Sequence, residues 1–119
     1  MDIETFRAYC LSKPLVTEEI PFGPETLVFK VAGKMFALTN IDSFESVNLK
    51  CDPEIALQLR EQYQEVKPGY HMNKKHWNTV LTDGVIGDDL MKKWVDHSYD
   101  LVVKGLPQKK QQEINTLKS

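Results

Sequence analysis

The stretch of chain between Lys67 and Val80 gathers more side chains with possible chemical roles than any other part of the sequence. It carries three lysines, two histidines, two asparagines, a tyrosine and a tryptophan around a Pro68-Gly69 pair. Lysine, histidine and asparagine can donate hydrogen bonds to phosphate groups, and aromatic rings can stack on planar ligands. A stretch that only connected two elements would not need this set, so the segment is the first candidate for a binding function.

Metal binding and catalysis are not expected from these residues. His71 and His76 are five positions apart with no cysteine or carboxylate between them, whereas a zinc site needs three or four ligands. His97 and Ser98 are neighbours, and neighbouring side chains on a helix point in different directions, so they do not form a catalytic triad. No glycine-rich phosphate-binding loop is present. We therefore expect a protein that is not an enzyme and uses no metal or cofactor.

Length and charge limit the class of protein. The chain has 119 residues, which suits one domain over residues 1–119, and a formal net charge of -2. This balance excludes a strongly basic nucleic-acid-binding domain, although most basic residues fall in the second half. Cys10 and Cys51 are isolated and are expected to act as small hydrophobic residues. With no signal peptide and no apolar run of ~20 residues, a cytoplasmic protein without a membrane segment is expected.

Capping and breaker residues predict three helices. The first is expected between Asp2 and Pro14, the second from Pro53, and the longest over residues 88–105. The polar residues 108–119 are expected to form a short helix or a frayed end.

Alternating hydrophobic residues predict four strands. These are residues 27–31, 35–39, 47–51 and 77–82. Residues 18–24, rich in proline and glycine, are expected to form a loop. The order is thus helix, three strands, helix, strand, helix, and the short hairpin connections imply a mainly antiparallel sheet. Helices on one face of that sheet give an α+β two-layer sandwich.

Two binding functions remain open for the segment 68–80. The first is weak, sequence-tolerant binding of DNA or another polyanion, in which lysines neutralise phosphates and aromatic rings stack on bases. The residues expected to make these contacts are Lys67, His71, Asn73, Lys74, Lys75, Trp77, Lys92 and Lys93. The alternative is a module that binds a partner protein or a small anionic ligand in a pocket. That pocket would be lined by Phe22, Tyr70, His71, His76 and Trp77.

A structural role for the same segment competes with both functions. Pro68-Gly69 fixes a bend, and Asn73 and Asn78 can satisfy backbone groups in an irregular loop. Trp77 would then lie in the core, and the lysines would be solvated. The segment would in that case be a clasp between the preceding helix and the following strand.

Several short motifs, spread over most of the chain, are shared with one known family. They are Ile20-Pro21-Phe22-Gly23-Pro24-Glu25-Thr26, residues 29–31 with 36–38, residues 48–53, residues 68–80, Asp83-Gly84 and Ser98-Tyr99. In these motifs the chain resembles the MmcQ/YjbR-like proteins, a family of small bacterial proteins, over almost its whole length. The resemblance implies a CyaY-like fold, that of bacterial frataxin, and no established enzymatic activity. Hairpin-like segments in the family are likened to a double-wing DNA-binding arrangement, so the resemblance implies DNA binding by structural analogy alone.

A frataxin-like fold also raises the question of iron. Frataxins present a dense acidic ridge on the first helix and first strand. Here the first expected helix carries only Asp2 and Glu4 as acidic residues, and the first expected strand carries Lys30. The resemblance therefore implies the fold without an iron site.

Overall fold

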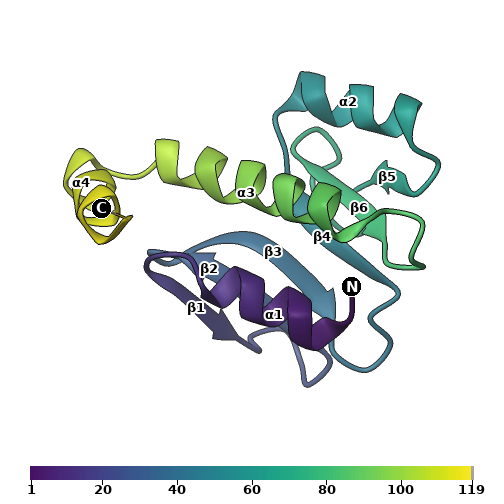
Figure 1. Cartoon of the computed structure of the whole chain (residues 1–119), viewed down its shortest axis with the longest axis horizontal. Coiled ribbons are helices and arrows are strands. Elements are labelled where there is room, and N and C mark those ends of the chain that lie inside the picture. Colours follow the sequence, from purple (N-terminus) through teal and green to yellow (C-terminus); the bar gives the residue numbers. More distant parts are fainter. Residues whose placement is uncertain (119) are drawn as a thin grey trace.

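Four helices and six strands make up residues 1–118, the part of the chain that the computed structural model describes (Figure 1). The helices are α1 (Ile3–Leu11), α2 (Pro53–Gln62), α3 (Asp88–Lys104) and α4 (Gln108–Lys118). The strands are β1 (Val16–Glu19), β2 (Thr26–Val31), β3 (Lys34–Asn40), β4 (Ser46–Lys50), β5 (Val66–Pro68) and β6 (Trp77–Leu81). They pair antiparallel in one sheet of order β1-β2-β3-β4-β6-β5. The predicted α+β class is confirmed, while residue 119 of the expected domain lies outside the described residues.

The helices begin where the sequence offers carboxylates to their first turns. Asp2 accepts a hydrogen bond from a first-turn N–H of α1 at 2.8 Å, and Asp52 does the same for α2, whose first residue is Pro53. α3 has no side-chain cap, but Asp88 and Asp89 lie in its first turn, where they favour the positive end of the helix dipole. The predicted starts of these three helices are therefore confirmed.

All four helices contribute to one hydrophobic core on the same face of the sheet. Figure 1 shows α3 crossing the central strands, with α1 beside it and α2 near β5 and β6. Phe6 of α1 meets Phe29 of β2 edge to face, with ring centroids 5.7 Å apart, and Phe36 of β3 meets Tyr99 of α3 in the same way at 5.6 Å. Ile114 of α4 is fully buried in this core, so the polar tail is a docked helix through residue 118.

The opposite face of the sheet carries no helix in residues 1–118. Side chains alternate between the two faces of a strand, and here the alternate positions form a smaller, more polar surface. We call this surface the open face; its residues include Val28, Met35, Leu38, Asn48, Trp77 and Thr79. The loop between β5 and β6 covers part of it and packs Met72 against the apolar cluster of Val28, Leu38 and Trp77.

Two edge strands were not predicted from the sequence. Glu18 and Glu19 were placed in a loop but belong to β1, where they bind Arg7 at 2.6 Å and Lys30 at 2.7 Å. β5 has only three residues and ends at Pro68, whose missing N–H is tolerated at the edge of a sheet. Each strand is short and carries one valine among polar residues or proline, so neither has the apolar alternation that identifies a half-buried strand.

Candidate functional site

The loop between β5 and β6, residues 69–76, is held against the open face by hydrogen bonds to β6. The Gly69 N–H donates to the carbonyl oxygen of Trp77 at 2.8 Å, which extends the pairing of the two strands. A Cβ at position 69 would lie 2.7 Å from the Cβ of Trp77, so glycine alone fits there without displacing the strand. The Tyr70 N–H donates to Oγ1 of Thr79 at 2.8 Å. These contacts fix the loop at its entry.

Arg60 of α2 ties the same loop to the helical face. Its Nε donates to Oδ1 of Asn78 at 2.7 Å, and its Nη2 donates to the carbonyl oxygens of Trp77, at 3.2 Å, and of Lys74. Asn78 is only 2% exposed, so this contact is shielded from water. The clasp between helix and strand is therefore present, with Arg60 at its centre. Arg60 was not predicted as a site residue; the available signal was an arginine, one of two in the chain, in the last turn of a predicted helix.

Trp77 and His76 do not lie with the other residues predicted for the ligand pocket. Trp77 is 7% exposed and packs with Val28 and Leu38, so neither face of its ring is free for a ligand. His76 lies where the loop meets the end of β4, and its carbonyl oxygen accepts a hydrogen bond from the Cys51 N–H at 2.8 Å. Its side chain does not line the hollow described below. The carbonyl oxygens of both residues accept hydrogen bonds that hold the loop in place, from Cys51 and from Arg60.

A hollow of about 520 Å³ opens on the open face between the β1–β2 loop and the β5–β6 loop. Its walls include Phe22, Met35, Leu38, Asn48, Tyr70 and His71. Phe22 is 66% exposed and Tyr70 is 69% exposed, which is unusual for such large side chains. The rings of Tyr70 and His71 lie against each other, with centroids 4.1 Å apart. Three of the five residues predicted for a ligand pocket, Phe22, Tyr70 and His71, thus come together.

The polar floor of this hollow is oriented by a chain of hydrogen bonds. Oγ1 of Thr79 accepts from the Tyr70 N–H, so its hydroxyl proton is free to donate to Oδ1 of Asn48 at 2.5 Å. The amide of Asn48 is therefore turned so that its NH₂ group makes no hydrogen bond within residues 1–118. The hollow offers a donor for a ligand acceptor at this point.

The first group of predicted basic residues lies on β5 and the loop that follows it, with Lys74 and Lys75 lining a shallow pocket against Glu54 and Leu57 of α2. Lys67, Asn73, Lys74 and Lys75 are exposed on β5 and the following loop, as is His71. Nζ of Lys74 donates to the carbonyl oxygen of Gly69 at 3.2 Å, and Oδ1 of Asn73 accepts from the Lys75 N–H at 2.9 Å. Residues 66–76 contain no acidic side chain, so the local charge is positive.

Lys92 and Lys93, in contrast, point to different sides of α3. Nζ of Lys92 lies 5.3 Å from the centre of the Tyr9 ring on α1, whereas Lys93 lines a cavity between α3 and α2. Successive residues on a helix are separated by about 100° around its axis, which accounts for the difference. The prediction that both lysines extend one basic surface with Lys74 and Lys75 is therefore wrong.

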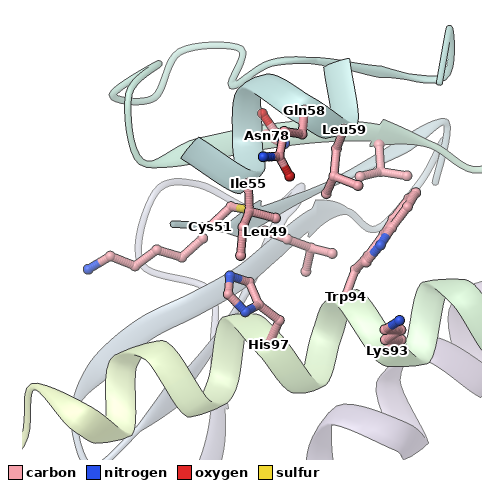
Figure 2. Close-up of a pocket in the computed structure, with 11 residues that line it drawn as sticks. Leu49, Cys51, Ile55, Gln58, Leu59, Asn78, Lys93, Trp94 and His97 are labelled. Atoms are coloured by element: carbon pink, nitrogen blue, oxygen red, sulfur yellow. The ribbon is translucent and has the colours of Figure 1, made fainter. Parts of the chain in front are cut away.

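The cavity beside Lys93 is a second concave site, bounded by α2, α3, β4 and β6. Its volume is about 310 Å³, and Figure 2 shows Ile55 and Leu59 of α2 facing Trp94 and His97 of α3 across it. This cavity was not predicted, because its lining comes from four elements that are separated in the sequence.

Neither cysteine is expected to react with iodoacetamide at about pH 8 while the protein is folded. Burial raises the pKa of Cys10 to about 12 and that of Cys51 to about 11, so the nucleophilic thiolate is scarce in both cases. Mass spectrometry after a short exposure should find no adduct on the native protein and two adducts on the denatured protein. Rapid labelling of native Cys51 would contradict the burial of this cavity wall.

The described residues contain no group of three or more histidine, cysteine or carboxylate side chains placed to hold a metal ion. Among the four helices of residues 1–118, none is long and apolar enough to cross a membrane.

Comparison with known proteins places the chain in a family. The model of the YjbR family matches residues 11–101. The chain is 40% identical over 112 residues to the uncharacterized protein YbdF of Escherichia coli O157:H7, covering 93% of this chain and 92% of YbdF. It is 35% identical to the uncharacterized protein YjbR of Escherichia coli strain K12, covering 92% of this chain and 94% of that protein.

Solved structures agree with this placement. The crystal structure of the Deinococcus radiodurans protein DR2400, with the family-model domain DUF419, superposes with a TM-score of 0.88 at 39% identity, over 95% of this chain and 87% of that one. A crystal structure from Pseudomonas syringae superposes with a TM-score of 0.72 at 28% identity, over 85% of this chain and 98% of that one. The match of sequence and fold over nearly the whole chain makes this protein a member of the YjbR family.

Proposed function

We propose that this protein binds single-stranded nucleic acid across the open face of its sheet, without catalysing a reaction. The observation that carries the proposal is the pair of exposed aromatic rings, Phe22 and Tyr70, on the walls of one hollow in that face. Every unpaired base offers a flat surface for stacking, so exposed rings on a sheet hold single strands with little regard to sequence.

Hydrogen-bond donors beside these rings suit the polar groups of a nucleotide. The free NH₂ group of Asn48 lies on the floor of the hollow and can meet an acceptor on a base edge. His71 packs against Tyr70 with its ring tilted by 58° and can donate to a phosphate or a base. The oriented Asn48 amide thus adds a polar contact to the two stacking surfaces.

Positive charge on the neighbouring loop supports contact with phosphates. Lys67 pairs with Thr79 and so lies on the open face. Lys74 and Lys75 are exposed farther along, in the loop after β5, where they line a shallow pocket with α2 residues that include Glu54. The formal net charge of the whole chain is -2, so long-range attraction of a polyanion is weak. We therefore propose binding that is modest in affinity, tolerant of sequence and strongly reduced by salt.

The Lys74→Gln/Lys75→Gln variant tests this proposal. Each phosphate contact that is lost should lower the slope of log K against log[salt] by ~0.7 for a single strand, so the double variant should lose about 1.4. The measurement is fluorescence anisotropy of a labelled single-stranded oligonucleotide at several salt concentrations, with a duplex of the same sequence alongside. The single strand should bind more tightly, because only unpaired bases can stack on Phe22 and Tyr70.

A matched control is available in the adjacent pair Lys109 and Lys110 of α4. The Lys109→Gln/Lys110→Gln variant removes the same charge from a helix that packs on the opposite face of the sheet. It should leave the salt slope nearly unchanged. Equal losses in both double variants would point to bulk charge rather than to the loop, and no binding at low salt would exclude the proposed function.

A small anionic ligand in the same hollow is the second candidate. The hollow is concave, as small-molecule sites are, with Met35 and Leu38 in its wall and Asn48 on its floor. A mononucleotide that raises the melting temperature and displaces the labelled strand would favour this candidate. If only the oligonucleotide binds, nucleic acid remains the better assignment.

A further inference from the structure

We infer that the cavity between α2 and α3 is a second binding site, suited to a small organic anion with an apolar body, such as a medium-chain carboxylate. This site lies on the helical face of the sheet, whereas the proposed nucleic-acid surface is the open face. The two proposals therefore stand or fall separately.

The shape and lining of the cavity suit an apolar body. Its volume of about 310 Å³ falls at the lower end of the ~300–1,000 Å³ typical of small-molecule sites. Leu49, Leu59, Val80 and Trp94 form apolar walls. Figure 2 shows the Trp94 ring lying along one side, with Leu59 opposite. A ligand here would exchange water contacts for contacts with fixed apolar side chains.

The charges at this cavity favour an anion. Lys93 lines it, and no aspartate or glutamate of residues 1–118 does; Lys50 borders it at the end of β4, but its pairing with Trp77 directs its side chain toward the open face. Neither lysine makes an ion pair with a carboxylate within residues 1–118. A carboxylate at the mouth of the cavity would therefore meet the ammonium group of Lys93, which has no carboxylate partner within residues 1–118.

Two further polar groups in the wall are oriented by the fold. Nε2 of His97 accepts a hydrogen bond from the Asp52 N–H at 3.2 Å, which leaves Nδ1 as the ring nitrogen that can contact a ligand. Oδ1 of buried Asn78 is taken by Arg60 at 2.7 Å, and its Nδ2 makes only a 3.4 Å contact with the Ala56 carbonyl oxygen. The second N–H of Asn78 is thus without a partner in the described chain. Both groups can fix the orientation of an oxygen-bearing ligand.

Octanoate is the probe for this site. Octanol and octylammonium have the same chain length and serve as the neutral and the cationic control. Titration calorimetry below the micellar range, with Trp94 fluorescence as a second readout, should give saturable binding of octanoate. Octanol should bind more weakly, and octylammonium should not bind. The Lys93→Gln variant should lose about fivefold in octanoate affinity, a modest loss because Lys93 is exposed and water screens its charge.

Lys92→Gln is the matched control, since Lys92 lies on the α1 side of the same helix. It should bind octanoate like the native protein. Ile55→Phe should fill the mouth of the cavity and prevent binding; Ile55 is 38% exposed, so this variant should still fold, as circular dichroism can verify. Both Lys93→Gln and Ile55→Phe should bind single-stranded DNA normally. Equal binding of octanoate and octylammonium, or no binding of octanoate, would overturn the inference.

Discussion

Replacing both Phe22 and Tyr70 by alanine is expected to weaken the binding of single-stranded DNA by at least roughly 30-fold. An aromatic ring that stacks on a base contributes about 1–3 kcal/mol, and the loss of two rings at the low end of that range corresponds to about 30-fold in affinity. Both side chains are mostly exposed, so their removal should leave the core intact. Anisotropy at one fixed low salt concentration measures the loss, and the denaturation midpoint checks the fold.

Two single substitutions make this result interpretable. Tyr70→Phe keeps the ring and should bind like the native protein, because stacking needs the ring rather than the hydroxyl. Leu117→Ala removes a side chain of comparable exposure, 58%, from α4 and should have no effect on binding. Native-like affinity in a folded Phe22→Ala/Tyr70→Ala variant would mean that the open face does not contact nucleic acid.

Arg60→Ala is expected to lower the free energy of unfolding by about 2–3 kcal/mol. The substitution leaves the buried Oδ1 of Asn78 without its donor and frees the carbonyl oxygens of Lys74 and Trp77 from their common partner. Urea denaturation measures the loss. Hydrogen exchange should accelerate most in residues 69–76, since these residues depend on the clasp for their position. Single-stranded DNA should also bind more weakly, because the loop carries Lys74 and Lys75.

The other arginine of the chain provides the comparison. Arg7 makes a two-pronged contact with Glu18, at 2.5 and 2.6 Å, but on the surface, where water screens the pair. Arg7→Ala should therefore destabilise the protein clearly less than Arg60→Ala, and it should leave the loop protected from exchange. Arg60→Lys should not restore full stability, because an ammonium group cannot reproduce the fork of donors. A similar small loss in both alanine variants would contradict the role of Arg60 as a clasp.

The helix starts and the central strands could be predicted because their signals are local. Asp2 and the Asp52-Pro53 pair act within one turn of the residues that they cap, so no knowledge of the rest of the fold is needed. β1 and β5 could not be found in this way, because each is defined by its pairing partner rather than by its own pattern of residues.

The candidate site was predicted only in part, for the same physical reason. Tyr70 and Trp77 are both large aromatic residues in one segment, yet Tyr70 is exposed on the open face and Trp77 is buried against β2 and β3. That difference depends on the path of the loop, which hydrogen bonds from distant residues determine. Lys92 and Lys93 are neighbours in the sequence and were predicted to share one surface. Consecutive residues of a helix point in different directions, so the two lysines lie on different sides of α3.

The short edge strands have a consequence for how the molecule behaves at high concentration. An exposed sheet edge can pair with the edge of another molecule and begin aggregation, and proteins oppose this with charge, proline and short strands. β1 places Glu18 and Glu19 on one edge, and β5 ends the other edge at Pro68 after three residues. The molecule can therefore leave much of one sheet face free of helices while its edges resist strand addition by a second copy.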